Sequence, residues 1–191
     1  NNAAGVLIYP QQMNSSTPPM SITVKNSYIT SKTGWGIQLM PLWQDGVGGF
    51  VRFENCVIED VQGPGIFMMA KAAYRAQYEF VNCTWNRVAK ASVNGFPANP
   101  FVMSGQFPDR TPEYGGLRFT NSVLYDSLAR NFLVALTPAG SRGLANIKGN
   151  LYIVNPNPAG LTASYGASAH DIALAVTAGA PAAAAATHTS T

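Results

Sequence analysis

The chain alternates apolar and polar residues in short stretches that recur along its length. Five stretches align with one another: ITVKNSYI (22–29), VRFENCVI (51–58), YEFVNCTW (78–85), LRFTNSVL (117–124) and, more weakly, ANIKGNLY (145–152). The period of two predicts β-strands, and successive copies start 29, 27, 39 and 28 residues apart. Strands that return at a nearly constant interval are typical of a solenoid.

A second apolar motif follows each of the first four copies: GWGIQLM (34–40), GPGIFMM (63–69), NPFVMSG (99–105) and RNFLVAL (130–136). Its leading apolar residue comes 15 residues after the start of the first motif in three copies, at Ile37, Ile66 and Phe132. In the third copy this residue is Phe101, eight residues later, so residues 87–99 are predicted to form a loop. Leucine-rich repeats have a similar period but also fixed leucines, which are missing here. The sequence therefore predicts a β-solenoid.

The repeated apolar-x-apolar-x-Asn-(Cys/Ser)-x-apolar string and the following G-x-G-I resemble the right-handed parallel β-helix superfamily, the pectate-lyase-like coils, over about residues 5–153. The resemblance implies an all-β, right-handed parallel β-helix of about five coils. It also implies hydrogen-bonded asparagines at a tight turn between two strands, here Asn26, Asn55, Asn82 and Asn121. Ser27, Cys56, Cys83 and Ser122 would then stack inward after the corner. The fifth copy has Gly149-Asn150, so the ladder is expected to end or shift there.

The predicted solenoid covers residues 1–154, and residues 155–191 are expected to form an irregular tail or linker rich in Ala, Thr and Pro. GVLIY (5–9) resembles the second strand of a coil whose first strand is missing. Such a coil needs a cap, from a preceding segment, another chain or the leading residues themselves. HDIALAVTAG (170–179) is expected to dock as either a strand or a short helix.

Cys56 and Cys83 fall on neighbouring coils, close enough at Cα for a disulfide. Parallel strands rarely orient the two Cβ atoms for this bond, so two buried free thiols are favoured. A catalytic cysteine is disfavoured because both histidines, His170 and His188, lie in the tail.

Charged side chains fill the outward positions of the first motif. One predicted row is Thr23, Arg52, Glu79, Arg118 and Asn146, and the other is Lys25, Glu54, Val81, Thr120 and Lys148. Two interpretations are open: ion pairs between strands, or a groove for an acidic sugar in which Arg52 and Arg118 bind carboxylates. If the protein is an enzyme, the catalytic candidates are Arg52, Arg118, Lys25 and Glu79.

Exposed aromatic rings are the other candidate sugar contacts. Trp35, Trp43, Tyr74 and Tyr114 fall in predicted turns or loops, where each ring is either a sugar platform or part of loop packing; Trp85 aligns with core positions. The outward residues of the second strand are predicted to be Gln38, Phe67, Val102 and Leu133. The last three are apolar, which predicts a face covered by the tail or by another subunit.

Composition narrows the class of protein. The chain has 191 residues, enough for one domain, with 11% charged and 47% hydrophobic residues and a net charge of +3. Nothing in this pattern favours a nucleic-acid partner or a membrane span. With nine acidic residues spread over the coils, a metal site is not expected. No cofactor is predicted either.

The resemblance implies an extracellular module, secreted or on the cell surface, that binds a polysaccharide. Whether it also cleaves the polymer, as a lyase or glycoside hydrolase, stays open, because the paired carboxylates of the polygalacturonase-like pattern are missing. Two alternatives stand beside it. One is a structural stalk, adhesin or fibre subunit that self-associates end to end or through the Phe67–Leu133 face. The other is a non-catalytic fragment of a larger lyase or hydrolase.

Overall fold

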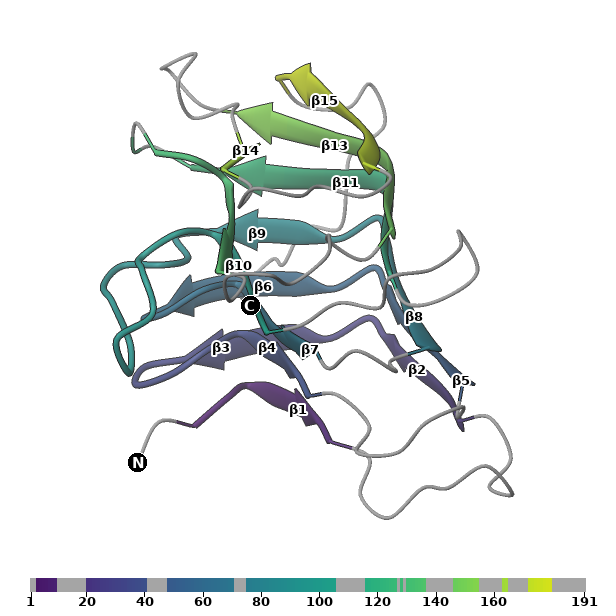
Figure 1. Cartoon of the computed structure of the whole chain (residues 1–191). Coiled ribbons are helices and arrows are strands. Elements are labelled where there is room, and N and C mark those ends of the chain that lie inside the picture. The colour runs from purple at the N-terminus through teal and green to yellow at the C-terminus, as the bar shows by residue number, and fades with distance from the viewer. Residues whose placement is uncertain are drawn as a thin grey trace.

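The computed structural model describes residues 3–9, 20–40, 48–70, 75–105, 116–126, 128, 130–136, 146–154, 163–164 and 172–179. These residues form fifteen β-strands, and they contain no helix. The strands are paired in parallel across successive turns of the chain, so the predicted parallel β-solenoid is confirmed (Figure 1). In the described part of the chain, no helix is long and apolar enough to cross a membrane.

Three faces surround the core. Face A contains β2 (Met20–Lys25), β5 (Gly48–Glu54), β8 (Arg75–Val81) and the first halves of β11 (Gly116–Tyr125) and β13 (Asn146–Val154). Face B contains β3 (Tyr28–Ser31), β6 (Val57–Val61), β9 (Thr84–Asn86) and the second halves of β11 and β13. Face C contains β1 (Val6–Ile8), β4 (Ile37–Leu39), β7 (Ile66–Ala70), β10 (Phe101–Gly105), β12 (Leu133–Leu136) and β14 (Ala163–Ser164).

The corner between faces A and B is made by four asparagines in the left-handed conformation, with φ of 49°, 53°, 52° and 45° at Asn26, Asn55, Asn82 and Asn121. Asparagine reaches this conformation more readily than other residues with a side chain. Each Nδ2 donates to the Oδ1 one coil earlier: Asn55 to Asn26 at 3.3 Å, Asn82 to Asn55 at 3.2 Å, and Asn121 to Asn82 at 2.7 Å. The expected asparagine ladder is therefore present.

Gly149 takes the corner in the next coil, at φ 100°. A Cβ atom there would collide with the carbonyl oxygen of Phe119, so the position requires glycine. The strand register shifts between Phe119 and Ser122, which makes this corner shorter than the asparagine corners. As a result Arg118 pairs with Lys148, and the predicted placement of Asn146 beside Arg118 is wrong.

Aromatic rings stack along the solenoid axis inside the core. Phe53, Phe80 and Phe119 occupy equivalent positions of β5, β8 and β11, with ring centroids 5.3 and 5.4 Å apart. Trp85 is fully buried and contacts Phe80 edge-on at 5.4 Å. The prediction that Trp85 belongs to the core is confirmed.

The residues aligned on β12 are displaced by one position from the prediction. Phe101 of β10 pairs with Leu133, and not with Phe132. Leu133 is buried in the core, so its predicted outward position is wrong. Phe132 precedes the strand and is also buried. The displacement arises because the fourth coil has one extra residue before β12.

The outer side of face C is covered by the protein's own loop, residues 87–99. Val93 and Phe96 form an isolated antiparallel bridge around Asn94-Gly95, both with positive φ, as in a tight hairpin turn. Phe96 contacts Phe67 at 4.5 Å between centroids. At Phe67 the predicted cover comes from this loop, and not from the tail or from another subunit. The apolar character of Phe67 is therefore no argument for self-association through this face.

Strand pairing continues beyond residue 154. β15 (Ile172–Ala178) pairs in parallel with β13 from Ile147 to Ile153, so the HDIALAVTAG segment contributes a strand and not a helix. Near the other end, β1 pairs with β4, as expected for a second-motif strand.

Candidate functional site

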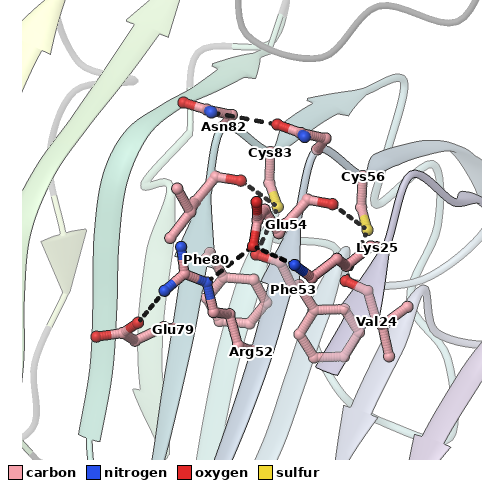
Figure 2. Close-up of polar contacts among 12 residues, drawn as sticks. Val24, Lys25, Arg52, Phe53, Glu54, Cys56, Glu79, Phe80, Asn82 and Cys83 are labelled. Atoms are coloured by element: carbon pink, nitrogen blue, oxygen red, sulfur yellow. Dashed lines mark hydrogen bonds and ion pairs between the residues drawn. The ribbon is translucent and has the colours of Figure 1, made fainter. Parts of the chain in front are cut away.

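The four catalytic candidates lie on face A, where the structure brings them together in one charge ladder. Arg52 Nε lies 3.2 Å from Glu54 Oε2, and Arg52 Nη1 lies 3.6 Å from Glu79 Oε2 (Figure 2). Lys25 pairs with Glu54 at 3.4 Å, and Arg118 pairs with Glu79 at 3.5 Å. The parallel register places these residues on neighbouring coils, and this geometry fits the interpretation of ion pairs between strands.

The ladder has a surplus of positive charge at one end. Glu79 is shared by Arg52 and Arg118, and Lys148 lies beside Arg118 in the register. Arg118 is 57% exposed and its pair is long, so this ion pair is weak. Face A therefore offers an exposed cation with no bidentate partner, which is compatible with weak anion binding.

A second polar cluster lies on face B and centres on Glu59. Its carboxylate accepts hydrogen bonds from Tyr28 Oη at 3.2 Å and Asn86 Nδ2 at 2.6 Å, and pairs with Arg87 Nη2 at 2.9 Å. Desolvation raises the pKa of the Tyr28 hydroxyl above its ordinary value, and the hydrogen bond to Glu59 adds to the rise. These contacts hold the carboxylate in one orientation.

Asp60 is the second acid of this cluster. Its carboxylate accepts from Arg87 Nε and Nη2 at 2.8 and 3.0 Å and from Lys90 Nζ at 2.9 Å. Hydrogen bonds from Arg87 and Lys90 hold the pKa of Asp60 well below its usual range. Glu59 and Asp60 both lie within β6.

The backbone around this cluster is strained. Asp60, Arg87 and Ala89 have φ of 53°, 51° and 56°, in the left-handed region that residues with side chains seldom adopt. Such strain tends to gather at functional sites, where the surrounding structure holds it. Here it accompanies the ion pairs of Asp60 and the entry into the 87–99 loop.

A cleft of about 620 Å³ opens beside this cluster, within the range of small-molecule sites. Its lining residues come from β9, the start of the 87–99 loop, β11 and the following segment, and β13: Asn86, Arg87, Val88, Ala89, Lys90, Tyr125, Asp126, Leu128, Arg130 and Val154. Tyr125 is 40% exposed and Leu128 53% exposed. The cleft therefore combines apolar walls with a few polar groups.

Arg130 and Asp126 form a buried pair at this cleft, with Arg130 Nη2 2.9 Å from Asp126 Oδ1. Arg130 also donates to the carbonyl oxygens of Ala89 and Ala98, both at 2.6 Å, and of Val88 at 3.0 Å. The guanidinium thus ties both ends of the 87–99 loop to the fourth coil. This role is structural.

Of the four predicted aromatic sugar contacts, the structure describes Trp35 alone. Trp35 is buried, 6% exposed, and stacks on Phe67 with centroids 4.9 Å apart. Trp35 therefore packs beneath the 87–99 loop, which fits the second of its two interpretations, loop packing. Trp43, Tyr74 and Tyr114 lie outside the described residues.

Cys56 and Cys83 are buried free thiols, as predicted. Each sulfur lies 3.4–3.5 Å from two backbone carbonyl oxygens (Figure 2). The neighbouring Cys56 side chain and burial raise the pKa of Cys83, which keeps this thiol protonated and unreactive. Among the described residues, no group of three or more His, Cys, Asp and Glu side chains could hold a metal ion.

Sequence reasoning missed the face B site, although the repeat contains a signal for it. Glu59, Asn86 and Tyr125 each follow an asparagine of the ladder by four residues, so they share one outward row across three coils.

Searches against family models, curated proteins and solved structures give no match to the chain.

Proposed function

We propose that this β-solenoid binds a neutral polysaccharide in the face B cleft. The observation that carries the proposal is the combination of an exposed tyrosine ring at the cleft, Tyr125, with fixed polar side chains beside it, above all Asn86. A sugar has an apolar ring face and a hydroxyl edge. An aromatic ring next to hydrogen-bonding groups complements both parts.

Charge pairing at the cleft favours a neutral ligand over an acidic one. Arg87 and Lys90 contact Asp60, and Arg130 contacts Asp126. An acidic sugar placed here would meet cations that already have carboxylate partners, as well as the carboxylates themselves. Electrostatic complementarity would then contribute little to its binding.

An extracellular location belongs to the same proposal, as does membership of the pectate-lyase-like superfamily. Both are supported by the asparagine ladder and the three-faced coil, which are the features of the resemblance. Cleavage of the polymer is not part of the proposal. Glu59 is held by three donors, which suits a binding group better than one that must exchange a proton.

Native affinity electrophoresis tests the proposal. The protein is run in gels that contain neutral glycans, such as glucans, mannans and xylans, or acidic glycans, such as polygalacturonate and alginate. We expect retardation by at least one neutral glycan, lost in Tyr125→Ala and retained in the face A control Arg118→Gln. Retardation by acidic glycans alone, or equal retardation of the Tyr125→Ala variant, would contradict the proposal.

A further inference from the structure

Resting on the proposed function, we infer that the bound glycan lies along the solenoid axis, from the cleft at Tyr125 to a second aromatic contact at Tyr28. This site spans several coils, so its affinity depends on the length of the glycan as well as on the chemistry of its sugars. Tyr28 does not line the cleft, so the inference extends the site beyond it.

The register sets the direction of this row. Tyr125 of β11 pairs with Asn86 of β9, and Asn86 pairs with Glu59 of β6. Tyr28 lies on β3, the strand next to β6, where it pairs with Val57, two residues before Glu59; its hydroxyl reaches Glu59 from there. Four neighbouring strands cover three intervals, so the two tyrosines are separated by roughly 14 Å along the axis. That distance accommodates more than one sugar ring.

The two ends and the middle of the row have complementary chemistry. Tyr28 and Tyr125 are 42% and 40% exposed, so each offers a ring to the ligand. Between them, Asn86 has an acceptor oxygen and a second N–H besides the one given to Glu59. The Glu59 carboxylate has lone pairs in addition to those used by its three donors. Sugar hydroxyls between the rings would therefore meet both donors and acceptors.

The row is also held in place before a ligand arrives. Glu59 fixes the Tyr28 hydroxyl on one side and the Asn86 amide on the other, and Arg87 holds Glu59. Side chains that are already ordered lose little conformational freedom on binding. A preformed line of contacts at one residue per coil suits an extended polymer better than a single compact molecule.

The test uses the neutral polysaccharide that the protein binds, as a series of purified oligosaccharides of increasing length, in titration calorimetry. For the wild type we expect affinity to rise with length and then level off. Tyr28→Ala should leave the shortest oligosaccharides unaffected and weaken the longest by fivefold or more. Tyr125→Ala should weaken every length.

Tyr28→Phe is the matched control, because it keeps the ring and removes the hydroxyl. It should retain most of the affinity for long chains, and thermal melting should confirm that each variant is folded. Equal effects of Tyr28→Ala on all lengths, or no effect on any, would overturn the extended site while the proposed function stands. If the wild type binds no oligosaccharide or polysaccharide of the panel, the proposed function itself fails.

Discussion

Faces A and B both carry charged side chains across neighbouring coils, yet they form different surfaces. On face A, the charge ladder consists of long ion pairs at 3.2–3.6 Å, one within β5 (Arg52–Glu54) and the others between residues that the register places side by side. On face B, ion pairs and hydrogen bonds of 2.6–3.2 Å converge on Glu59 and Asp60, next to a cleft. The comparison indicates that the outward row of face B borders a cleft because the 87–99 loop interrupts the repeat there.

The interruption on face B is the 87–99 loop. It leaves β9 through Arg87 and Ala89, both in the left-handed conformation, and its first residues line the cleft. Arg130 then ties the loop to the next coil. Face A residues Arg52 and Glu79 lie on regular paired strands, so their ion pairs join them only to charged neighbours of the same ladder.

The largest expected effect separates the buried pair of the cleft from the exposed pairs of face A. Arg130→Ala leaves Asp126, 3% exposed, as an unpaired buried carboxylate, so we expect a loss of about 3–5 kcal/mol in the free energy of unfolding. Arg52→Ala is the control on face A, with an expected loss of about 1 kcal/mol or less. Urea denaturation measures both. Equal losses would contradict the contrast between the faces.

The second largest loss of stability is expected at the asparagine corner between faces A and B. Asn82→Ala forces alanine into φ 52° and removes two side-chain hydrogen bonds of the ladder, for an expected loss of about 2–4 kcal/mol. Asn82→Gly removes the same hydrogen bonds but tolerates the conformation, so we expect it to lose roughly half as much. If denaturant melts show glycine and alanine to be equally destabilising, the left-handed conformation contributes nothing.

Glu79→Gln tests whether face A is held by charge. The change removes the carboxylate that Arg52 and Arg118 share and leaves Arg118 beside Lys148, and we expect a loss of about 1 kcal/mol at low salt. Thermal melts should show a smaller loss in 0.5 M NaCl, because salt screens exposed charges. Adding Lys148→Gln should restore part of the stability. A loss that does not depend on salt would indicate packing as its cause.

The smallest expected effect is the pH dependence of Asp60 on face B. Because Arg87 and Lys90 lower its pKa in the folded protein, its contribution is fully present above the unfolded value of about 3.9 and is lost as the pH falls through the folded pKa. Asp60→Asn should therefore lower Tm by about 1–3 °C at pH 7, and the difference should shrink below pH 4. A difference that grows in acid would contradict this assignment.

The fold could be predicted from the sequence where the repeat is regular. The asparagine ladder, the buried Trp85 and the two free thiols follow from positions that recur in each copy. Errors occur where the repeat gains or loses a residue, before Leu133 and at the Gly149 corner, because each such change shifts the alignment of the adjoining strand residues and moves them to a different row.

The candidate site was harder to predict because it depends on where the 87–99 loop goes. The sequence indicated the length of this loop, but not that it would cover Trp35 and Phe67 and line a cleft on face B. Asp60, in the left-handed conformation, lies at a β-bulge of β6 where Glu59 and Asp60 oppose the single residue Thr30 of β3, and no sequence rule for turns anticipates it.

The central claim is that face B, and not face A, holds the glycan. The most direct measurement is titration calorimetry of one neutral polysaccharide against the wild type, Tyr125→Ala and Arg118→Gln. We predict that Tyr125→Ala lowers affinity at least tenfold, which corresponds to about 1.4 kcal/mol. Arg118→Gln should bind like the wild type. Loss of binding in Arg118→Gln with full binding in Tyr125→Ala would contradict the account and return the site to the charge ladder of face A.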